Sequence, residues 1–268
     1  MDEAQYRRFM KELEKWNQMY DPNLKMIRKP FHSPGYHTTL KGGFVHPTRD
    51  TFTYAIALLD SGIEEYRQRA EEVLEKVLSL QDTDPSSKTY GIWSWFYEEP
   101  LEQMSPPDWN WADFCGKELL QVALDHSDRI SPDLLRKVKK SIYHAAQSII
   151  RRNMGPHYTN IAIMGTYVTL VAGQILKDDK IWEYGKNRLR RIHEYTMYHG
   201  AFTEYNSPTY TIVALEDISR MLLHVKDKEC LEMIEDLNLI GWKCLAEHFH
   251  PATWQWAGPH SRCYKSIQ

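Results

Sequence analysis

Residues 204–217 read Glu-Tyr-Asn-Ser-Pro-Thr-Tyr-Thr-Ile-Val-Ala-Leu-Glu-Asp, a polar and aromatic cluster that runs directly into an apolar stretch. Ser207 followed by Pro208 is typical of a helix N-cap with proline in the first turn, where its missing N–H is no loss. Asn206 then lies just outside a helix N-terminus, and Tyr210 lies in its first turn. Free backbone N–H groups and the positive end of the helix dipole favour an anionic ligand at this position.

The same unit occurs four times along the chain: an apolar helix with a polar start, followed by a charged amphipathic helix. Recurrence at intervals of roughly 50 residues predicts stacked helical hairpins, and therefore an all-α protein. A further amphipathic helix is predicted at residues 2–20, and a loop rich in proline and glycine at 21–47. The four pairs are predicted at 47–60 with 63–80, 109–126 with 132–152, 161–176 with 181–198, and 208–225 with 229–249.

Two architectures fit stacked hairpins, an open superhelical solenoid and an α/α toroid with inner and outer helices. A solenoid would repeat similar sequence from hairpin to hairpin, whereas here each apolar helix begins with a different polar cluster. We therefore expect one α/α toroid domain, an incomplete (α/α)6-type barrel, over residues 1–268. A β-rich fold is disfavoured because the strand-like stretch 167–171 lies inside a longer apolar helical pattern.

Composition narrows the class of protein and its partners. The chain has 268 residues, 42% of them hydrophobic, which is enough for a sizeable core. With 33 basic and 36 acidic residues the net charge is −3, so no global field favours nucleic acid or an anionic membrane. The N-terminus opens in a charged helix without a signal peptide, and no apolar run is long enough to span a bilayer, so we expect a cytoplasmic protein.

Cofactor and metal motifs are not found in the sequence. The four cysteines are scattered, and we expect free thiols. There is no glycine-rich loop of the kind that cradles phosphate, so no nucleotide or flavin is expected. The histidines do not have the i, i+4 spacing of zinc proteases, and we assign no metal site. The oligomeric state is left open.

Polar and aromatic side chains gather at the four predicted helix starts. In a toroid the inner helices run in the same direction, so these starts would converge on one end of the barrel. The C-terminal part adds His260, Arg262 and Tyr264, whose spacing by two places them on one side of an extended segment. The four helix starts are His46–Asp50, Asp108–Asp113, His157–Asn160 and Tyr205–Tyr210.

A toroid with Asn, Tyr, His and Arg at its opening, together with the run Ala-Gly-Pro-His-Ser-Arg at 257–262, resembles the polysaccharide lyases with toroid folds, the heparinase and alginate lyase group. More narrowly, it resembles lyases that act on rhamnose–glucuronate polysaccharides. The resemblance implies β-elimination on a uronic-acid-containing polysaccharide, with an acidic poly- or oligosaccharide as the partner. In that group β-sandwich domains usually follow the toroid. This sequence lacks them, so a truncated chain and a likeness of fold alone both stay open.

Elimination beside a carboxylate requires groups that neutralise the carboxylate and stabilise the charge that develops next to it, for which Asn and Arg side chains are suited. It also requires a base. Tyrosine ionises near ~10, so it serves at neutral pH only where a neighbouring cation lowers its pKa. The candidate bases are Tyr210 and Tyr264 with Arg262 nearby, or His157 or His260. The candidate substrate-binding residues are Asn160, Asn206, Arg262, Arg49, Trp109, Trp111, Tyr158 and Tyr205.

Each assignment has a structural alternative, and two other functions stay open. Asn160 is as well explained as a helix cap, and both tryptophans of 109–111 as core or wall residues. An inverting glycoside hydrolase on the same fold would need two carboxylates about 6.5–9.5 Å apart. The second of these functions is carbohydrate binding without catalysis, by the remnant of a larger lyase. The acids available to a hydrolase are Asp50, Asp113 and Glu204.

Overall fold

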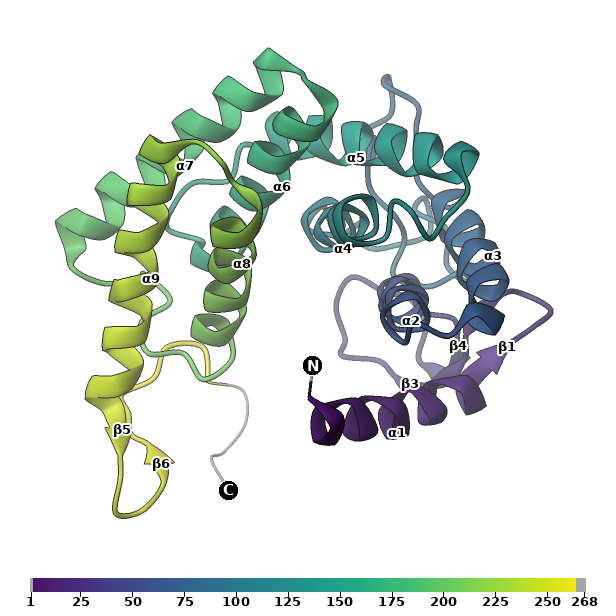
Figure 1. Cartoon of the computed structure of the whole chain (residues 1–268), viewed down its shortest axis with the longest axis horizontal. Coiled ribbons are helices and arrows are strands. Elements are labelled where there is room, and N and C mark those ends of the chain that lie inside the picture. Colours follow the sequence, from purple (N-terminus) through teal and green to yellow (C-terminus); the bar gives the residue numbers. More distant parts are fainter. Residues whose placement is uncertain (1, 264–268) are drawn as a thin grey trace. The chain divides into compact units, whose positions relative to one another are not determined.

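The computed structural model describes residues 2–263, and it is mostly helical, which confirms the all-α expectation (Figure 1). The chain divides into two compact units, Met1–Ser148 and Ile149–Gln268. The single toroid domain stays a prediction.

In the first unit, α2 is the central helix and packs against α1, α3 and α4. The predicted contrast between buried and surface helices is confirmed here. On α2, buried residues lie on most sides, whereas α3 buries one stripe at helical spacing, Ala70, Val73, Leu74 and Val77. The elements are α1 Glu3–Met19, β1 Tyr20–Asp21, β2 Met26–Ile27, β3 Lys29–His32, β4 Gly42–Val45, α2 Thr48–Asp60, the 3-10 helix Glu64–Tyr66, α3 Arg67–Leu78, α4 Trp111–Asp125 and α5 Pro132–Arg152, which continues into the second unit.

The segment predicted as a loop at 21–47 contains two short antiparallel ribbons instead. β1 pairs with β2, and β3 pairs with β4 in the register Lys29↔Val45 to His32↔Gly42. Such strands are too short to produce a readable alternation in the sequence, and β2 is held in place by contacts with α2 and α3. One of these is the hydrogen bond from the Ile27 N–H to the Thr51 hydroxyl, 3.2 Å.

The second unit is two helical hairpins, in which α6 packs against α7 and α8, and α9 packs against α7 and α8 (Figure 1). Glycines allow α6 and α7 to approach closely. A Cβ at Gly173 would lie 2.5 Å from backbone atoms of Trp182, and one at Gly185 would lie 2.7 Å from the Leu170 nitrogen. The elements are α6 Thr159–Leu176, α7 Asp179–His199, α8 Tyr210–His224, α9 Lys228–His248, β5 Phe249–His250 and β6 Gln255–Trp256.

Helix α6 is the most apolar of the described helices. By length and composition it is sufficient to cross a membrane, but 83% of its 18 residues are buried inside the protein, as in the core helix of a globular domain. The predicted burial of this stretch is therefore confirmed.

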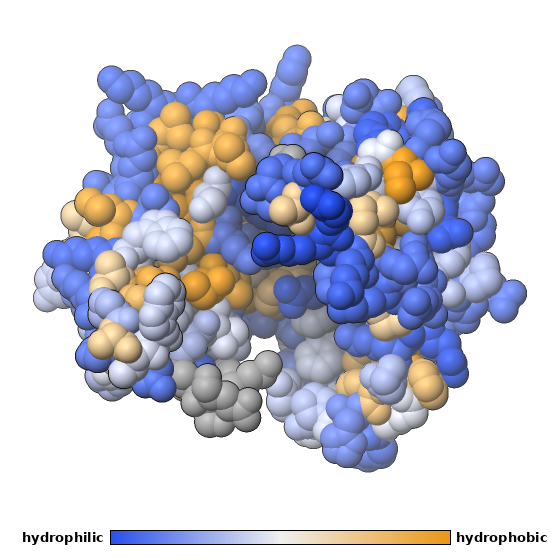
Figure 2. All heavy atoms as spheres, turned by 60° about the horizontal axis from the view of Figure 1, so that its bottom comes forward, coloured by the Kyte–Doolittle hydropathy of each residue, from blue (hydrophilic) through white to orange (hydrophobic). Residues whose placement is uncertain are grey.

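Helix α8 is less buried than its apolar sequence predicts. Its inner side buries Ala214, Leu215 and Ile218, but Leu223 is 79% exposed and Ile212 39% exposed. Figure 2 shows hydrophobic surface, in orange, on the side where α8 and α9 lie, at the left of the view. Exposed apolar side chains on α9 are Leu239 and Trp242. The α8–α9 hairpin therefore carries an apolar outer surface as well as its packed inner one.

Candidate functional site

The start of α8 brings together several of the sequence-predicted site residues. We call Tyr158, Glu204, Tyr210 and Arg262 the Arg262 cluster. The Arg262 guanidinium forms an ion pair with Glu204 and donates a hydrogen bond to the Tyr210 hydroxyl, 3.2 Å. Its central carbon lies 4.1 Å from the centre of the Tyr210 ring and 5.3 Å from that of Tyr158. The four side chains thus surround one cation.

Glu204 connects this cluster to the start of α6. Its carboxylate accepts a hydrogen bond from the Asn160 N–H, 2.7 Å, and its own N–H donates to the Thr159 hydroxyl, 3.2 Å. A carboxylate at a helix N-terminus is stabilised by the unpaired N–H groups and by the helix dipole. The expectation that helix starts come together therefore holds for α6 and α8 within the second unit.

The prediction that Ser207 is the N-cap was wrong: α8 begins at Tyr210 rather than at Pro208, and its N-cap is Thr209. The Ser207 hydroxyl still accepts a hydrogen bond from the Tyr210 N–H, 3.1 Å, at the first residue of the helix. The residue before it, Asn206, has a positive φ of 49°, in the left-handed region that Asn adopts more readily than most residues.

The Asn206 side chain faces the C-terminal segment of the chain. Its amide nitrogen donates to the carbonyl oxygens of Ala257, 2.8 Å, and Pro259, 3.0 Å, and its oxygen accepts from the Trp256 indole N–H. Both amide hydrogens and the amide oxygen therefore have partners within the protein. Asn206 holds the segment 256–259 against the start of α8, and it does not present its amide to a ligand in this arrangement.

His260 belongs to the same anchor. Its Nδ1 lies 2.7 Å from the Asn206 carbonyl oxygen and its Nε2 lies 3.1 Å from that of Trp256. The alternation predicted for His260 and Arg262 does not occur, because Arg262 has a positive φ of 48° and the chain is not extended there. Tyr264 lies outside the described residues. Of His260 and Arg262, only Arg262 thus belongs to the Arg262 cluster.

Three other predicted site residues of the second unit are not members of this cluster. Tyr205 is partly exposed and its hydroxyl lies 3.0 Å from His248 Nε2. Asn160 is buried, and its side-chain oxygen has no hydrogen-bond partner among the described residues. His157 is exposed, and no hydrogen bond within the described part of the chain joins it to the cluster.

In the first unit, the predicted site residues at the starts of α2 and α4 also meet. The Arg49 guanidinium stacks 4.1 Å over the Phe114 ring. The Trp95 ring lies 5.2 Å from Trp111, and its N–H donates to Asp108, 3.2 Å. Arg49 and Trp111 therefore take part in packing between helix starts, which is the structural alternative foreseen for Trp111.

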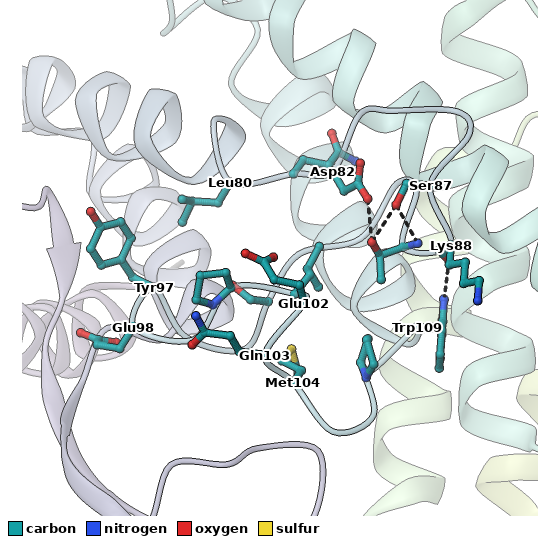
Figure 3. A pocket seen from close by; sticks show the side chains of 16 residues that line it. Leu80, Asp82, Ser87, Lys88, Tyr97, Glu98, Glu102, Gln103, Met104 and Trp109 are labelled. Carbon is teal, nitrogen blue, oxygen red and sulfur yellow. Dashed lines mark hydrogen bonds between the residues drawn. The ribbon is translucent and has the colours of Figure 1, made fainter.

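Trp109 has a different environment, on the wall of a pocket of about 960 Å³ formed by the loops 80–89 and 94–109 (Figure 3). Its indole N–H donates to the Lys88 carbonyl oxygen, 3.1 Å, which fixes the ring. Most lining residues were missed from the sequence, where 81–108 carries no periodic pattern. They include Lys88, Tyr97, Glu98, Glu102 and Gln103.

Ion pairs beside this pocket hold one of its walls. His46 Nδ1 contacts the Glu98 carboxylate, whose other oxygen accepts from the His46 N–H, 2.9 Å. His46 Nε2 lies 3.2 Å from Asp21. The backbone N–H of Asn23, and more weakly His46, hold the pKa of Asp21 below its ordinary value. His46 is thus a structural contact between two carboxylates.

The carboxylates that a hydrolase would need are engaged elsewhere. Asp50 pairs with Lys29, Asp113 is buried, and Glu204 is buried and paired with Arg262. Among residues 2–263, no group of three or more His, Cys, Asp or Glu side chains is arranged to hold a metal ion.

Comparisons with known proteins give a family and a distant structural likeness. No curated protein matches the sequence. A solved structure described as a circular tandem repeat protein with novel repeat topology and enhanced subunit contact surfaces is similar at 15% identity and a TM-score of 0.30, over 75% of this chain. The match spans 45% of that protein, less than half its length. A family model described as a domain of unknown function, DUF8769, matches residues 7–266, and the chain belongs to that family.

Proposed function

We propose that this chain is a polysaccharide lyase that cleaves a uronic-acid-containing polysaccharide by β-elimination at the Arg262 cluster. The observation that carries the proposal is the contact of the Tyr210 hydroxyl with the Arg262 guanidinium, 3.2 Å, with the cation also stacked on the same ring. A cation beside a phenol oxygen favours the phenolate form, which is the form that accepts a proton.

In this mechanism Tyr210 removes the proton next to the uronate carboxylate. The bond to the leaving glycosidic oxygen breaks on the neighbouring carbon, a carbon–carbon double bond forms, and the leaving oxygen takes up a proton, so no water is consumed. Arg262 stabilises both the phenolate and the negative charge that develops on the substrate carboxylate. The Arg262 side chain is 34% exposed.

Glu204 limits how strongly Arg262 can attract an acidic substrate. Its carboxylate is buried and compensates the guanidinium charge. The substrate carboxylate therefore shares the cation with Glu204, which weakens the attraction of Arg262 for the substrate carboxylate and for the Tyr210 phenolate alike. The protein must then bind the polysaccharide through additional contacts along the length of the polysaccharide.

We also propose that the hairpins form part of an α/α toroid. In each unit an apolar helix packs beside an amphipathic one, α2 with α3 and α6 with α7, which is the inner and outer pairing that a toroid needs. The absence of a cofactor requirement and the cytoplasmic location stay predictions from the sequence.

Incubation with polyglucuronate, alginate and heparin, followed by ultraviolet absorbance of unsaturated uronate products, tests the function. We expect product from the full chain and loss of at least about a hundredfold in kcat for Tyr210→Phe, which removes only the hydroxyl. The control is Tyr198→Phe, on the exposed side of α7, with unchanged kcat. No unsaturated product from any acidic polysaccharide, or full activity in Tyr210→Phe, rejects the proposal.

A further inference from the structure

The pocket belongs to the first unit and the Arg262 cluster to the second, and the proposed lyase reaction does not use the pocket. At about 960 Å³ it is at the upper end of the range in which proteins bind small organic ligands. Figure 3 shows Tyr97 and Trp109 on opposite sides of it, with Glu102, Gln103 and Met104 between them. The pocket thus has an aromatic ring on either side, with two polar side chains, Glu102 and Gln103, and the apolar Met104 between them.

The orientation of the Trp109 ring suits stacking with a ligand. Its indole N–H is already bonded to the Lys88 carbonyl oxygen, so the ring is fixed without using its faces. On the other side, Tyr97 is partly exposed, and the Lys76 ammonium lies 4.1 Å from its ring centre. Fixed aromatic rings lose little conformational entropy when a flat apolar surface packs on them.

The charged side chains of the pocket are of two kinds: engaged ones, which have a hydrogen-bond or ion-pair partner in the protein, and open ones, which have none among the described residues. Glu98 is paired with His46, and Asp82 accepts from the Thr89 hydroxyl, 2.6 Å. Glu102 and Lys88 remain, and neither side chain has a hydrogen bond or ion pair within the described residues. With Asp82 and Glu98 the lining has three carboxylates and one ammonium group, a charge balance that disfavours an anionic ligand.

Glu102, Lys88 and Gln103 also differ in hydrogen-bonding type. A carboxylate only accepts, an ammonium only donates, and an amide does both. A ligand that satisfies all three needs groups that both donate and accept, together with a flat apolar face for Trp109. A sugar ring with its hydroxyl groups has both features, whereas a uronate chain would bring its carboxylates close to Glu102 and Glu98.

We propose that this pocket binds an uncharged oligosaccharide, stacked on Trp109 and hydrogen-bonded through its hydroxyl groups to Glu102, Gln103 and Lys88. This is a second carbohydrate site of different charge preference from the one proposed at Arg262, and it does not depend on lyase activity.

Calorimetric titration of the full chain with cellohexaose, mannohexaose, xylohexaose and hexagalacturonate tests this proposal. We expect at least one neutral hexasaccharide to bind, and Trp109→Ala to weaken it by about tenfold or more, which corresponds to about 1.4 kcal/mol. The matched control, Trp242→Ala, removes an exposed tryptophan of α9 and should bind as the unchanged chain does.

A second variant, Glu102→Gln, keeps the shape of the side chain and should weaken the neutral ligand severalfold without changing the thermal unfolding temperature. Loss of binding in Trp109→Ala then reports the pocket and not misfolding. The proposal is overturned by the absence of binding to all three neutral sugars at millimolar concentration, by unchanged affinity in Trp109→Ala, or by preferential binding of hexagalacturonate that Trp109→Ala abolishes. Failure of the lyase assay with retained neutral-sugar binding rejects the proposed function alone.

Discussion

In the second unit, Arg262 pairs with Glu204, and Asn206 is bonded to three groups of the C-terminal segment. In the first unit, the side chains of Glu102 and Lys88 line a pocket and have no hydrogen-bond or ion-pair partner among the described residues. Both regions combine acidic, basic and aromatic side chains at loops before helices. They differ in whether the polar groups are satisfied by the protein itself.

This difference separates two uses of the same residue types. Polar groups that are buried must be paired, because an unpaired one costs about 1–3 kcal/mol. The groups around Arg262 and Asn206 therefore stabilise the fold whether or not they also act on a ligand. The groups around Glu102 face solvent and add little to stability, so their placement in a pocket with fixed rings is better explained by binding.

The largest expected effect is on Asn206. Asn206→Ala removes hydrogen bonds to Ala257, Pro259 and Trp256 and places alanine at a positive φ, so unfolding free energy should fall by about 3 kcal/mol. The control Asn206→Gly loses the same bonds without backbone strain and should fall by about 1 kcal/mol less. Urea denaturation followed by circular dichroism measures both. Two variants as stable as the unchanged chain would show that the anchor is not formed in solution.

The next effect concerns the ion pair. Arg262→Met leaves the buried Glu204 carboxylate without its cation, and we expect a loss of about 2 kcal/mol, less than for a fully buried pair because Arg262 is partly exposed. Combining it with Glu204→Gln should recover much of the loss, since a glutamine oxygen still accepts from the Asn160 N–H. A double-mutant cycle gives the coupling. Simple additivity of the two changes would contradict the pairing.

The smallest effects compare two acids of the first unit. Asp108 is buried and accepts from the Trp95 indole and the Asn110 N–H, so Asp108→Ala should cost about 1–2 kcal/mol. Glu102→Ala should stay within about 0.5 kcal/mol, because its side chain is exposed and unpaired. Thermal unfolding of both variants checks this. Equal losses of stability in the two variants would contradict the distinction between side chains that are paired within the protein and side chains that are not.

Much of the fold was predictable because helical periodicity is local. The pairs of apolar and amphipathic helices occur where expected, with ends that differ by a few residues, as at Tyr210 for α8. The β1–β2 and β3–β4 ribbons were missed because two- to four-residue strands leave no pattern. The extended arrangement expected around Arg262 was wrong because its backbone is left-handed there.

The candidate site was predictable in part. The sequence singled out Tyr210, Arg262 and Tyr158, which do lie together, since each is close to a helix start or to a conspicuous polar run. It gave Asn206 a ligand-binding role, whereas the folded chain uses its amide to hold residues 256–259. The pocket beside Trp109 was not foreseen, because its lining comes from irregular loops.

The sequence by itself determined that the protein is helical, which helices are apolar and which amphipathic, and where each helix lies to within a few residues. These properties depend on residues within a few turns of one another. The tertiary structure decided which polar groups are paired and which have no partner in the protein. Contacts such as that of Arg262 with Glu204 join residues 58 positions apart in the sequence, and they therefore depend on the tertiary fold. That distinction, which no local pattern carries, separates the anchored cluster of the second unit from the open pocket of the first.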